Sequence, residues 1–525
     1  MKEEKNINRG FILQVLATLQ PAEASIVPEE PRLDVHAAVS KFAFLYERIR
    51  TAVDYKDEHV LRKSAILRIL KRQLLFEHDP EEIAANLLRE LIGARYLPNN
   101  ELPESKIPET AVHIRAYQSI VRARVGSPAH FAWLRRVLSV ELEELLVNAT
   151  REKAFVTILY EQLVSRVRVT GTSIDDADLQ LQIYIACHRS LLKADDDTLS
   201  FKLLRIFLPE WMRPREWIDA PVAVAERLIG VEQRIKAQLR HPLGSKLQRA
   251  VKPWAVSFSL LTETLLEKPD EATRLLETPE ELRAVAARLA DRQYRNAKGK
   301  LRRGAFRAIV YIFLTKMLVA FALEVPIERA VYGEVSLRTL AINLLFPPCL
   351  MFLVALFIRV PGRENTQRLQ QNIEVLRTGR IPNCDIRVTP RRGLVGTFLL
   401  GLLYATLYLF SFGLIAAVLL KLHFSWISIL VFLFFLCTVS FFAFRLRVTA
   451  REQVIVHDRE RLRSVLIDVL SLPILRVGLW LSRGISRLNV FIFFFDFLLE
   501  APFKIFLTVL EEWLAYLKEK KEDLQ

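Results

Sequence analysis

The residues of this sequence that could most readily take part in chemistry are charged residues inside apolar segments. Lys316 lies twelve residues into the apolar run 305–323. Asp496, Glu500 and Lys504 recur every four residues within FIFFFDFLLEAPFK near the C-terminus. Four-residue spacing places these three on one face of a helix. Ionisable groups in apolar helices usually pair with one another. We therefore expect a polar seam in which Lys316 meets Asp496.

This seam could either hold helices together or carry an ion. On a helical wheel of the C-terminal segment, Asp496, Glu500 and Lys504 fall within roughly 80° of one another, and the rest of the circumference is apolar. Helices that lie on a membrane surface have a broad polar face, so the narrow stripe indicates a helix buried on nearly all sides. An unpaired acid at mid-bilayer costs about 3 kcal/mol, and pairing between Glu500 and Lys504 would offset part of that cost. We favour the structural interpretation.

Other groups of titratable residues have simpler explanations. The pair His78-Asp79 could suggest a metal-dependent hydrolase, but Asp79 precedes a proline and two glutamates and is expected to cap a helix. Carboxylates four apart within 54–59 suit a solvated helix start, and the acidic triplet 195–197 complements a helix N-terminus. The sequence contains no GxxxxGK[ST], GxGxxG, GxSxG or HExxH motif. We predict no catalytic residue, no cofactor and no metal site, and an enzymatic role is disfavoured.

Small residues at four-residue spacing mark one apolar segment as a helix-packing element. Gly401 and Ala405 form one such pair, and Gly413 and Ala417 form another. Small side chains let a neighbouring helix approach closely in a membrane. The two pairs lie on different faces, because four-residue steps drift by about 40° on a helix of 3.6 residues per turn. We expect packing within this protein, with contact between two copies of the chain as the alternative.

Composition and periodicity indicate which elements carry these residues. The sequence is 51% hydrophobic and 25% charged, which is typical of a protein whose apolar and charged residues lie in different regions. Glycine occurs only 17 times, where average usage would give roughly 37, and this favours long helices over tight turns. Apolar residues at three- and four-residue intervals before residue 300 predict a soluble helical domain. We place a proline-rich linker at 98–110 between helical lobes 1–97 and 111–304.

Four long apolar runs follow the helical lobes. Each is long enough to cross about 30 Å of hydrocarbon as a helix. We predict two transmembrane hairpins, 305–358 and 396–444, joined by a basic loop over 359–395. Lys316 interrupts the first run, and the double proline at 347–348 interrupts the second. The four runs are 305–323, 339–358, 396–420 and 424–444.

Loop charges predict the orientation of these spans. Basic residues precede the first run, whereas Glu324, Glu328 and Glu334 lie in the loop after it. The loop 359–395 carries eight arginines against three acids, and six more arginines follow the fourth run. Basic loops stay on the cytoplasmic side, so we expect a plasma-membrane protein with both termini in the cytoplasm. These arginines account for much of the net charge of +15, and no nucleic-acid partner is expected.

A further pair of apolar segments, 464–482 and 488–510, lies within the C-terminal region 445–525. Arg483 and Arg487 in the turn between the two segments would have to lie outside if both segments crossed the membrane, which disfavours crossing. We favour a re-entrant hairpin at the cytoplasmic face, with two further spans as the alternative.

The sequence as a whole predicts an all-α integral membrane protein, with a large helical cytosolic domain before a helical transmembrane region. Its leading function is that of a membrane-anchored scaffold or assembly factor whose cytosolic helices bind a protein partner, because the large helical domain carries no catalytic motif. A small transporter or channel with a polar path through Lys316, Asp496 and Glu500 is the alternative. A membrane-bound metal-dependent enzyme is the least favoured. The lipid bilayer is the expected surrounding, and a second copy of the chain is a further candidate partner.

Overall fold

The computed structural model describes most of the chain, and the residues group into two units. Unit 1 comprises Met1–Leu276 and Val375–Arg387, and unit 2 comprises Glu277–Glu374 and Val388–Phe493, so far as these residues are described. The described residues are 8–19, 30–35, 44, 47, 58–76, 79–147, 150–332, 337–357, 361–388, 394–450, 454–455, 469 and 471–481.

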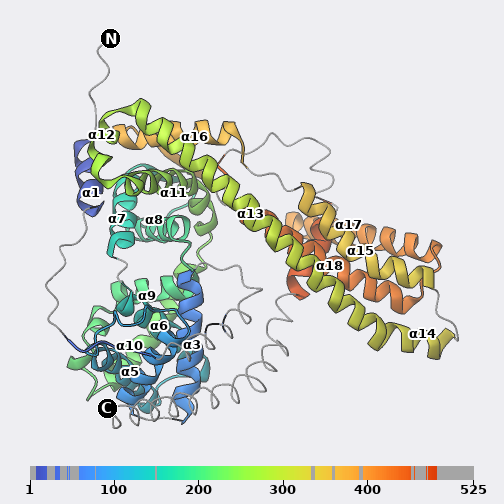
Figure 1. Ribbon diagram of the computed structural model, residues 1–525, viewed down its shortest axis with the longest axis horizontal. Coiled ribbons are helices and arrows are strands. Elements are labelled where there is room, and N and C mark those ends of the chain that lie inside the picture. Colours follow the sequence, from blue (N-terminus) through green and yellow to red (C-terminus); the bar gives the residue numbers. More distant parts are fainter. Residues whose placement is uncertain are drawn as a thin grey trace, which may run out of the picture. The chain divides into compact units, whose positions relative to one another are not determined.

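Unit 1 is built of helices (Figure 1), and one large apolar core within it is formed by residues between Leu33 and Ile235. Buried side chains of Phe11, Phe155 and Phe258 pack together outside this core. The core draws on both sides of the segment 98–110, for example on Leu88 and Leu134, whose exposed fraction is 0%. Within that segment the chain turns, and α5 already begins at Lys106. The helices of unit 1 are α1 (Arg9–Leu19), α3 (Glu58–Phe76), α4 (Pro80–Gly93), α5 (Lys106–Arg122), α6 (Pro128–Leu146), α7 (Thr150–Val164), α8 (Asp176–Leu191), α9 (Asp196–Phe207), α10 (Val222–Leu239), α11 (Gly244–Glu267) and α12 (Ala272–Glu277).

Two helix starts in unit 1 follow the expected capping chemistry. Asp79 precedes α4 and accepts a hydrogen bond from the backbone N–H of Glu81 at 3.4 Å. Asp195 precedes α9 and accepts one from the backbone N–H of Thr198 at 3.0 Å. Such caps satisfy backbone donors that the first helical turn leaves free. The assignment of both aspartates to helix starts is therefore confirmed.

A two-stranded parallel ribbon joins distant parts of unit 1. Strand β1 (Val167–Thr170) pairs with β2 (Cys384–Arg387), and Val167 is the register partner of Cys384. The backbone N–H of Cys384 also donates to the carbonyl of Arg166 at 2.8 Å. The expectation of an entirely α-helical chain missed this ribbon. Strands of four residues show too little periodicity to be recognised, and each is stabilised by a partner far away in the sequence.

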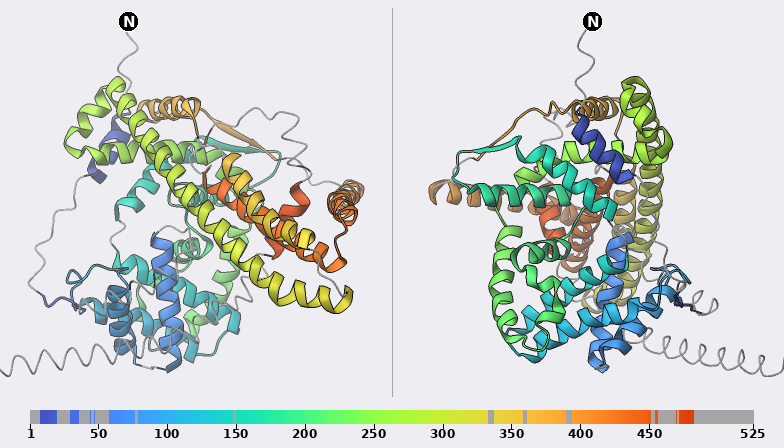
Figure 2. Two further views of the ribbon diagram at one scale, coloured as in Figure 1. Left: turned by 45° about the vertical axis from the view of Figure 1, so that its right-hand side comes forward. Right: turned by 90° about the vertical axis from the view of Figure 1, so that its left-hand side faces the viewer.

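Unit 2 is built on one long helical rod. Helix α13 (Pro279–Val319) runs for 41 residues and continues through a π turn, η4 (Ala320–Glu324), into α14 (Val325–Tyr332). Helices α15 and α18 pack against this rod and against each other (Figures 1 and 2). The other helices are α15 (Leu337–Phe357), α16 (Arg363–Thr378, whose last residues belong to unit 1), α17 (Leu394–Lys421) and α18 (Trp426–Ala450).

Three helices among the described residues are long and apolar enough to cross a membrane. Helix α15 covers the described part of the run 339–358, but its apolar part, Arg338–Leu353, is shorter than these three. A mostly helical chain with three candidate spans is therefore established, and the fourth span stays a prediction. The three candidate spans are Pro279–Ala330, Phe398–Lys421 and Trp426–Leu446.

A helical segment over 471–481 packs against α18. At Gly478 the approach is so close that an added Cβ would overlap the carbonyl oxygen of Cys437. The guanidinium of Arg476 lies over the ring of Tyr404 on α17, 4.8 Å from its centroid. This segment belongs to the first half of the predicted C-terminal hairpin. The second half, 488–510, lies outside the described residues.

Candidate functional site

One helical rod supplies three charged side chains to a buried cluster in unit 2. Lys316 lies near the end of α13, Glu324 ends the π turn, and Glu328 lies in α14. On a regular α-helix, residues eight apart diverge by about 80°. A π turn takes more residues per turn, because it closes i→i+5 hydrogen bonds. It therefore turns Glu324 back toward the face of Lys316, and the two charges meet.

Lys316 and Glu324 form an ion pair from which solvent is excluded. Nζ of Lys316 donates to Oε2 of Glu324 at 3.2 Å, and the two side chains are 0% and 1% exposed. Nζ also lies 4.8 Å from the ring centroid of Phe435 on α18, a distance at which the face of an aromatic ring attracts a cation. Lys316 is thus held between a carboxylate and an aromatic ring.

Two other helices bring hydrogen-bond donors to the glutamates. Nδ2 of Asn343 on α15 donates to Oε1 of Glu324. Oγ of Ser428, in the first turn of α18, lies 2.9 Å from Oε1 of Glu324 and is also hydrogen-bonded to Oε1 of Glu328. Ser425, just before α18, donates to Oε1 of Glu328 at 2.9 Å. The Lys316 cluster, as we call it, consists of Lys316, Glu324, Glu328, Asn343, Ser425 and Ser428.

The Ser428 hydroxyl lies between the two glutamates of the Lys316 cluster. It can donate to only one of these two carboxylates, so the other receives no hydrogen bond from Ser428. Glu324 and Glu328 are buried, so an uncompensated charge there is costly. One lysine against two glutamates leaves one negative charge uncompensated when all three are ionised. One added proton removes that charge.

The amide oxygen of Asn343 is a second unsatisfied acceptor. Asn343 is 0% exposed, and its Oδ1 accepts no hydrogen bond from the part of the chain that the structure describes. Buried oxygen atoms of this kind normally have a hydrogen-bond partner, so each exception needs an explanation. The cluster can therefore accept one further proton or one cation, which would balance its charge and interact with the unsatisfied oxygen of Asn343.

An apolar layer closes one side of the Lys316 cluster. Its residues lie on α13 one turn before Lys316 and in the later parts of α15 and α18, whereas Glu328 lies on α14 and Ser425 just before α18. A polar chain therefore starts at one end of the bundle and stops at Lys316. The layer is formed by Ile312, Met351, Val439 and Ala443.

Of the polar seam predicted from the sequence, the structure describes only Lys316. Its partner is Glu324, whereas Asp496, Glu500 and Lys504 lie outside the described residues and their seam stays a prediction. Sequence reasoning missed Glu324, because the apolar run seemed to end at 323 and the acids after it were assigned to a loop. The available signal was their spacing of four and their apolar neighbours in AFALEVPIERAVY.

The small residues of α17 lie on exposed faces of that helix. Gly401, Ala405, Gly413 and Ala417 are all exposed. A Cβ added at either glycine would meet no atom within 4 Å. Among the described residues no helix packs against these positions, and contact with another copy of the chain stays a prediction.

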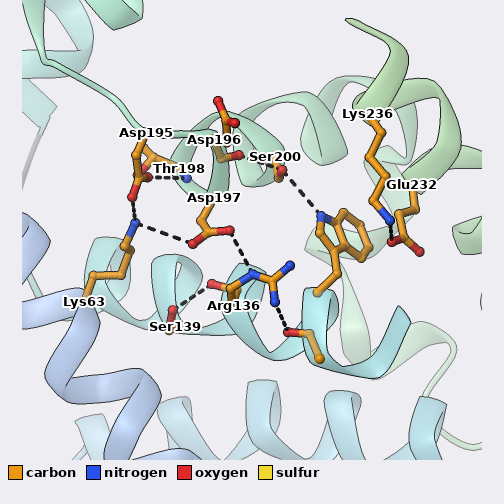
Figure 3. Close-up of polar contacts among 12 residues, drawn as sticks. Lys63, Arg136, Ser139, Asp195, Asp196, Asp197, Thr198, Ser200, Glu232 and Lys236 are labelled. Carbon is orange, nitrogen blue, oxygen red and sulfur yellow. Dashed lines mark hydrogen bonds and ion pairs between the residues drawn. The ribbon is translucent and has the colours of Figure 1, made fainter. Parts of the chain in front are cut away.

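The acidic triplet 195–197 in unit 1 belongs to a network of ion pairs that links three helices (Figure 3). Lys63 on α3 pairs with Asp195 and lies 3.9 Å from Asp197. Asp197 in turn accepts a hydrogen bond from Nε of Arg136 on α6 at 3.1 Å. Every oxygen contact in this network is explained by packing and capping. Among the described residues, no group of three or more His, Cys, Asp or Glu side chains is arranged to hold a metal ion.

Comparison with known proteins gives no independent assignment. No protein-family model, curated protein or solved structure matches this chain. The chemistry of its own residues is therefore the basis for assigning a role.

Proposed function

We propose that the chain is a multi-pass protein of the plasma membrane that conducts protons along the Lys316 cluster, as a small transporter or channel. The three long apolar helices, with α15 as a fourth, would form the spans. Both termini would lie in the cytoplasm, as the basic loops predict.

Reporter fusions at 330 and 422 should report the outer side and a fusion at 525 the inner side. A fusion at 485 distinguishes a re-entrant C-terminal hairpin, reported inside, from two further spans.

The observation that carries this proposal is a continuous chain of hydrogen bonds. It joins Ser425 to Glu328, Glu328 through Ser428 to Glu324, and Glu324 to Lys316. Ionisable residues buried in membrane helices are rare, and chains of them commonly relay protons. The position of Ser428 between the two buried glutamates supports the same interpretation.

In the proposed mechanism a proton enters at Glu328, from the end of the bundle where α18 begins. Glu328 gives its proton to the Ser428 oxygen while the Ser428 hydroxyl gives its own to Glu324, so the serine ends neutral. Protonation of Glu324 removes the charge that holds Lys316. The ammonium of Lys316 then loses its ionic partner but still contacts the ring of Phe435. The helical rod of α13 and α14 is then free to shift against the apolar layer. In this proposal the shift opens the apolar layer, Glu324 releases its proton on the far side, and the ionised carboxylate pairs with Lys316 again.

Purified full-length protein in liposomes with an internal pH-sensitive dye tests this proposal. With an imposed pH gradient and valinomycin to balance charge, wild-type vesicles should change internal pH at least tenfold faster than empty ones. Glu324→Gln should abolish the difference while the protein still inserts. If wild-type vesicles change internal pH no faster than empty vesicles, the proposal is refuted.

A scaffold role for unit 1 is the second candidate function. The observation that favours it is the large apolar core formed by residues between Leu33 and Ile235, beside which charged side chains such as Lys63, Asp195 and Asp197 pair with one another. Photo-crosslinkers on exposed positions of unit 1 in intact cells should then give one discrete cross-linked species. The same species in the Glu324→Gln variant would separate this role from proton conduction, and a uniform smear would count against a scaffold.

A further inference from the structure

A cavity of about 420 Å³ opens among three helices of unit 1 and the 3₁₀ turn η1 (Pro209–Met212). Its volume falls in the range of small-molecule sites. Helix α7 contributes Lys153, α8 contributes His188, and α9 contributes Lys202 and Arg205. None of these residues belongs to the Lys316 cluster, and the proposed proton path does not use them.

The cavity has more positive than negative charge. The ammonium groups of Lys153 and Lys202 lie 2.8 Å and 2.5 Å from the two carboxylate oxygens of Glu144, and Arg205 lies 3.9 Å from the nearer oxygen. Burial raises the pKa of Glu144, but the adjacent Lys202 and Lys153 lower it further, so its pKa is below the usual value. One carboxylate therefore faces three cations, and two positive charges have no counter-charge among the described residues of this concave site.

The wall of the cavity also holds a polar group without a partner. His188 is 3% exposed, and its Nδ1 has no hydrogen-bond partner among the described residues. Its ring packs edge-on against Tyr184, with centroids 4.4 Å apart. Burial, assisted by the charge of Lys202, lowers the pKa of His188 to about 4. At neutral pH the ring is therefore uncharged, and it offers one donor and one acceptor.

Part of the cavity lining is apolar. Ile206 and Met212 line the cavity and are 48% and 38% exposed, and Pro209 lies between them in the sequence. Exposed large apolar side chains beside a charged recess suit a ligand that has both an anionic group and an apolar part.

We propose that this cavity binds a phosphate-bearing small molecule, whose phosphate contacts Lys153, Lys202 and Arg205 and whose apolar part contacts Ile206 and Met212. A phosphate monoester carries close to two negative charges at neutral pH, which matches the two uncompensated positive charges. Arginine and lysine are the side chains that most often bind such groups. The phosphate can come from a soluble ligand or from a lipid headgroup, and the test separates these two sources.

Isothermal titration calorimetry on the full-length protein in detergent tests the proposal at constant ionic strength. Inorganic phosphate is the soluble probe, and dihexanoyl phosphatidic acid is the lipid probe. Lys153→Gln and Arg205→Gln each remove one partly exposed cation and should raise the Kd at least tenfold. Arg249→Gln is the matched control, because Arg249 is an exposed arginine on α11 that does not line the cavity, and it should leave the Kd unchanged. Circular dichroism confirms that each variant is folded.

Binding of inorganic phosphate with this pattern of variants supports the cavity as a site for a soluble phosphorylated ligand. Binding of phosphatidic acid alone, with the same pattern, supports it as a site for a lipid headgroup. Failure of both probes to bind, or an equal loss of affinity in Arg249→Gln, overturns the proposal. Neither result depends on proton flux, so the two proposals stand or fall separately.

Discussion

Lys316 and Glu324 form an ion pair of 3.2 Å across the π turn that separates them, and neither side chain reaches solvent. Lys316 also contacts the ring of Phe435 on α18. Glu324 also accepts hydrogen bonds from Asn343 on α15 and Ser428 on α18. A charge at either position is therefore compensated only while the other is present. The pair therefore stabilises the bundle by linking α13 to α18.

Removal of one partner of this pair should destabilise the protein more than removal of both. Lys316→Met leaves Glu324 buried without its cation, and Glu324→Gln leaves Lys316 without its carboxylate, so each should cost about 3–5 kcal/mol. The double variant should recover a large part of that loss. Unfolding curves in detergent for the four proteins of the cycle give the coupling energy. Additive losses would show that the two side chains do not depend on each other.

The close approach at Gly478 predicts opposite effects of the same substitution at two glycines. Gly478→Ala places a methyl group against the Cys437 carbonyl, so the segment 471–481 must move and its packing on α18 should weaken by about 1–3 kcal/mol. Gly401→Ala meets no atom within 4 Å and should be neutral or slightly stabilising, because alanine favours helix by about 1 kcal/mol. Thermal unfolding measures both. A destabilised Gly401→Ala would instead indicate that another surface packs at Gly401.

The sequence predicted the helical fold and drew attention to Lys316, because apolar length and an isolated charge are local signals. It did not predict the partner of Lys316. That partner depends on a π turn, whose extra residue changes the face on which Glu324 lies, and no residue type marks this turn. The β1–β2 ribbon was not predicted for a related reason: Val167 and Cys384 lie far apart in the sequence, and no local pattern indicates that they pair. The basic cavity was not recognised either, because its cations come from separate helices.

The buried His188 should make the protein less stable in mild acid. Its pKa is about 4 when folded and about 6.5 when unfolded, so the unfolded chain takes up the proton first. Its contribution is fully present above pH 6.5 and is lost as the pH falls toward 4, by roughly 2–4 kcal/mol in total. His188→Gln should flatten this part of the stability curve between pH 7 and 5, measured by chemical denaturation. An unchanged slope would mean that His188 does not stay neutral in the fold.

The parallel register of the ribbon predicts a specific cross-link. Val167→Cys places a thiol on β1 opposite the native Cys384 of β2, and neighbouring residues of paired strands lie on the same side of a sheet. Mild oxidation should therefore join the two in a Cys349→Ser background, since Cys349 is an exposed free thiol. Val169→Cys, whose partner is Ile386, is the matched control and should not cross-link. Mass spectrometry of the digested protein identifies the pair, and a stronger cross-link in the control would show a different register.

The proton path depends most directly on Ser428, which bridges the two glutamates. Ser428→Ala removes the bridging hydroxyl without removing a charge, and Thr438→Val removes a hydroxyl of the same helix that donates only to the backbone carbonyl of Phe434 among the described residues. The decisive measurement is dye-reported proton flux into liposomes that contain equal amounts of each protein. The account predicts at least a tenfold loss of flux for Ser428→Ala and wild-type flux for Thr438→Val. Equal flux in the two variants would contradict it.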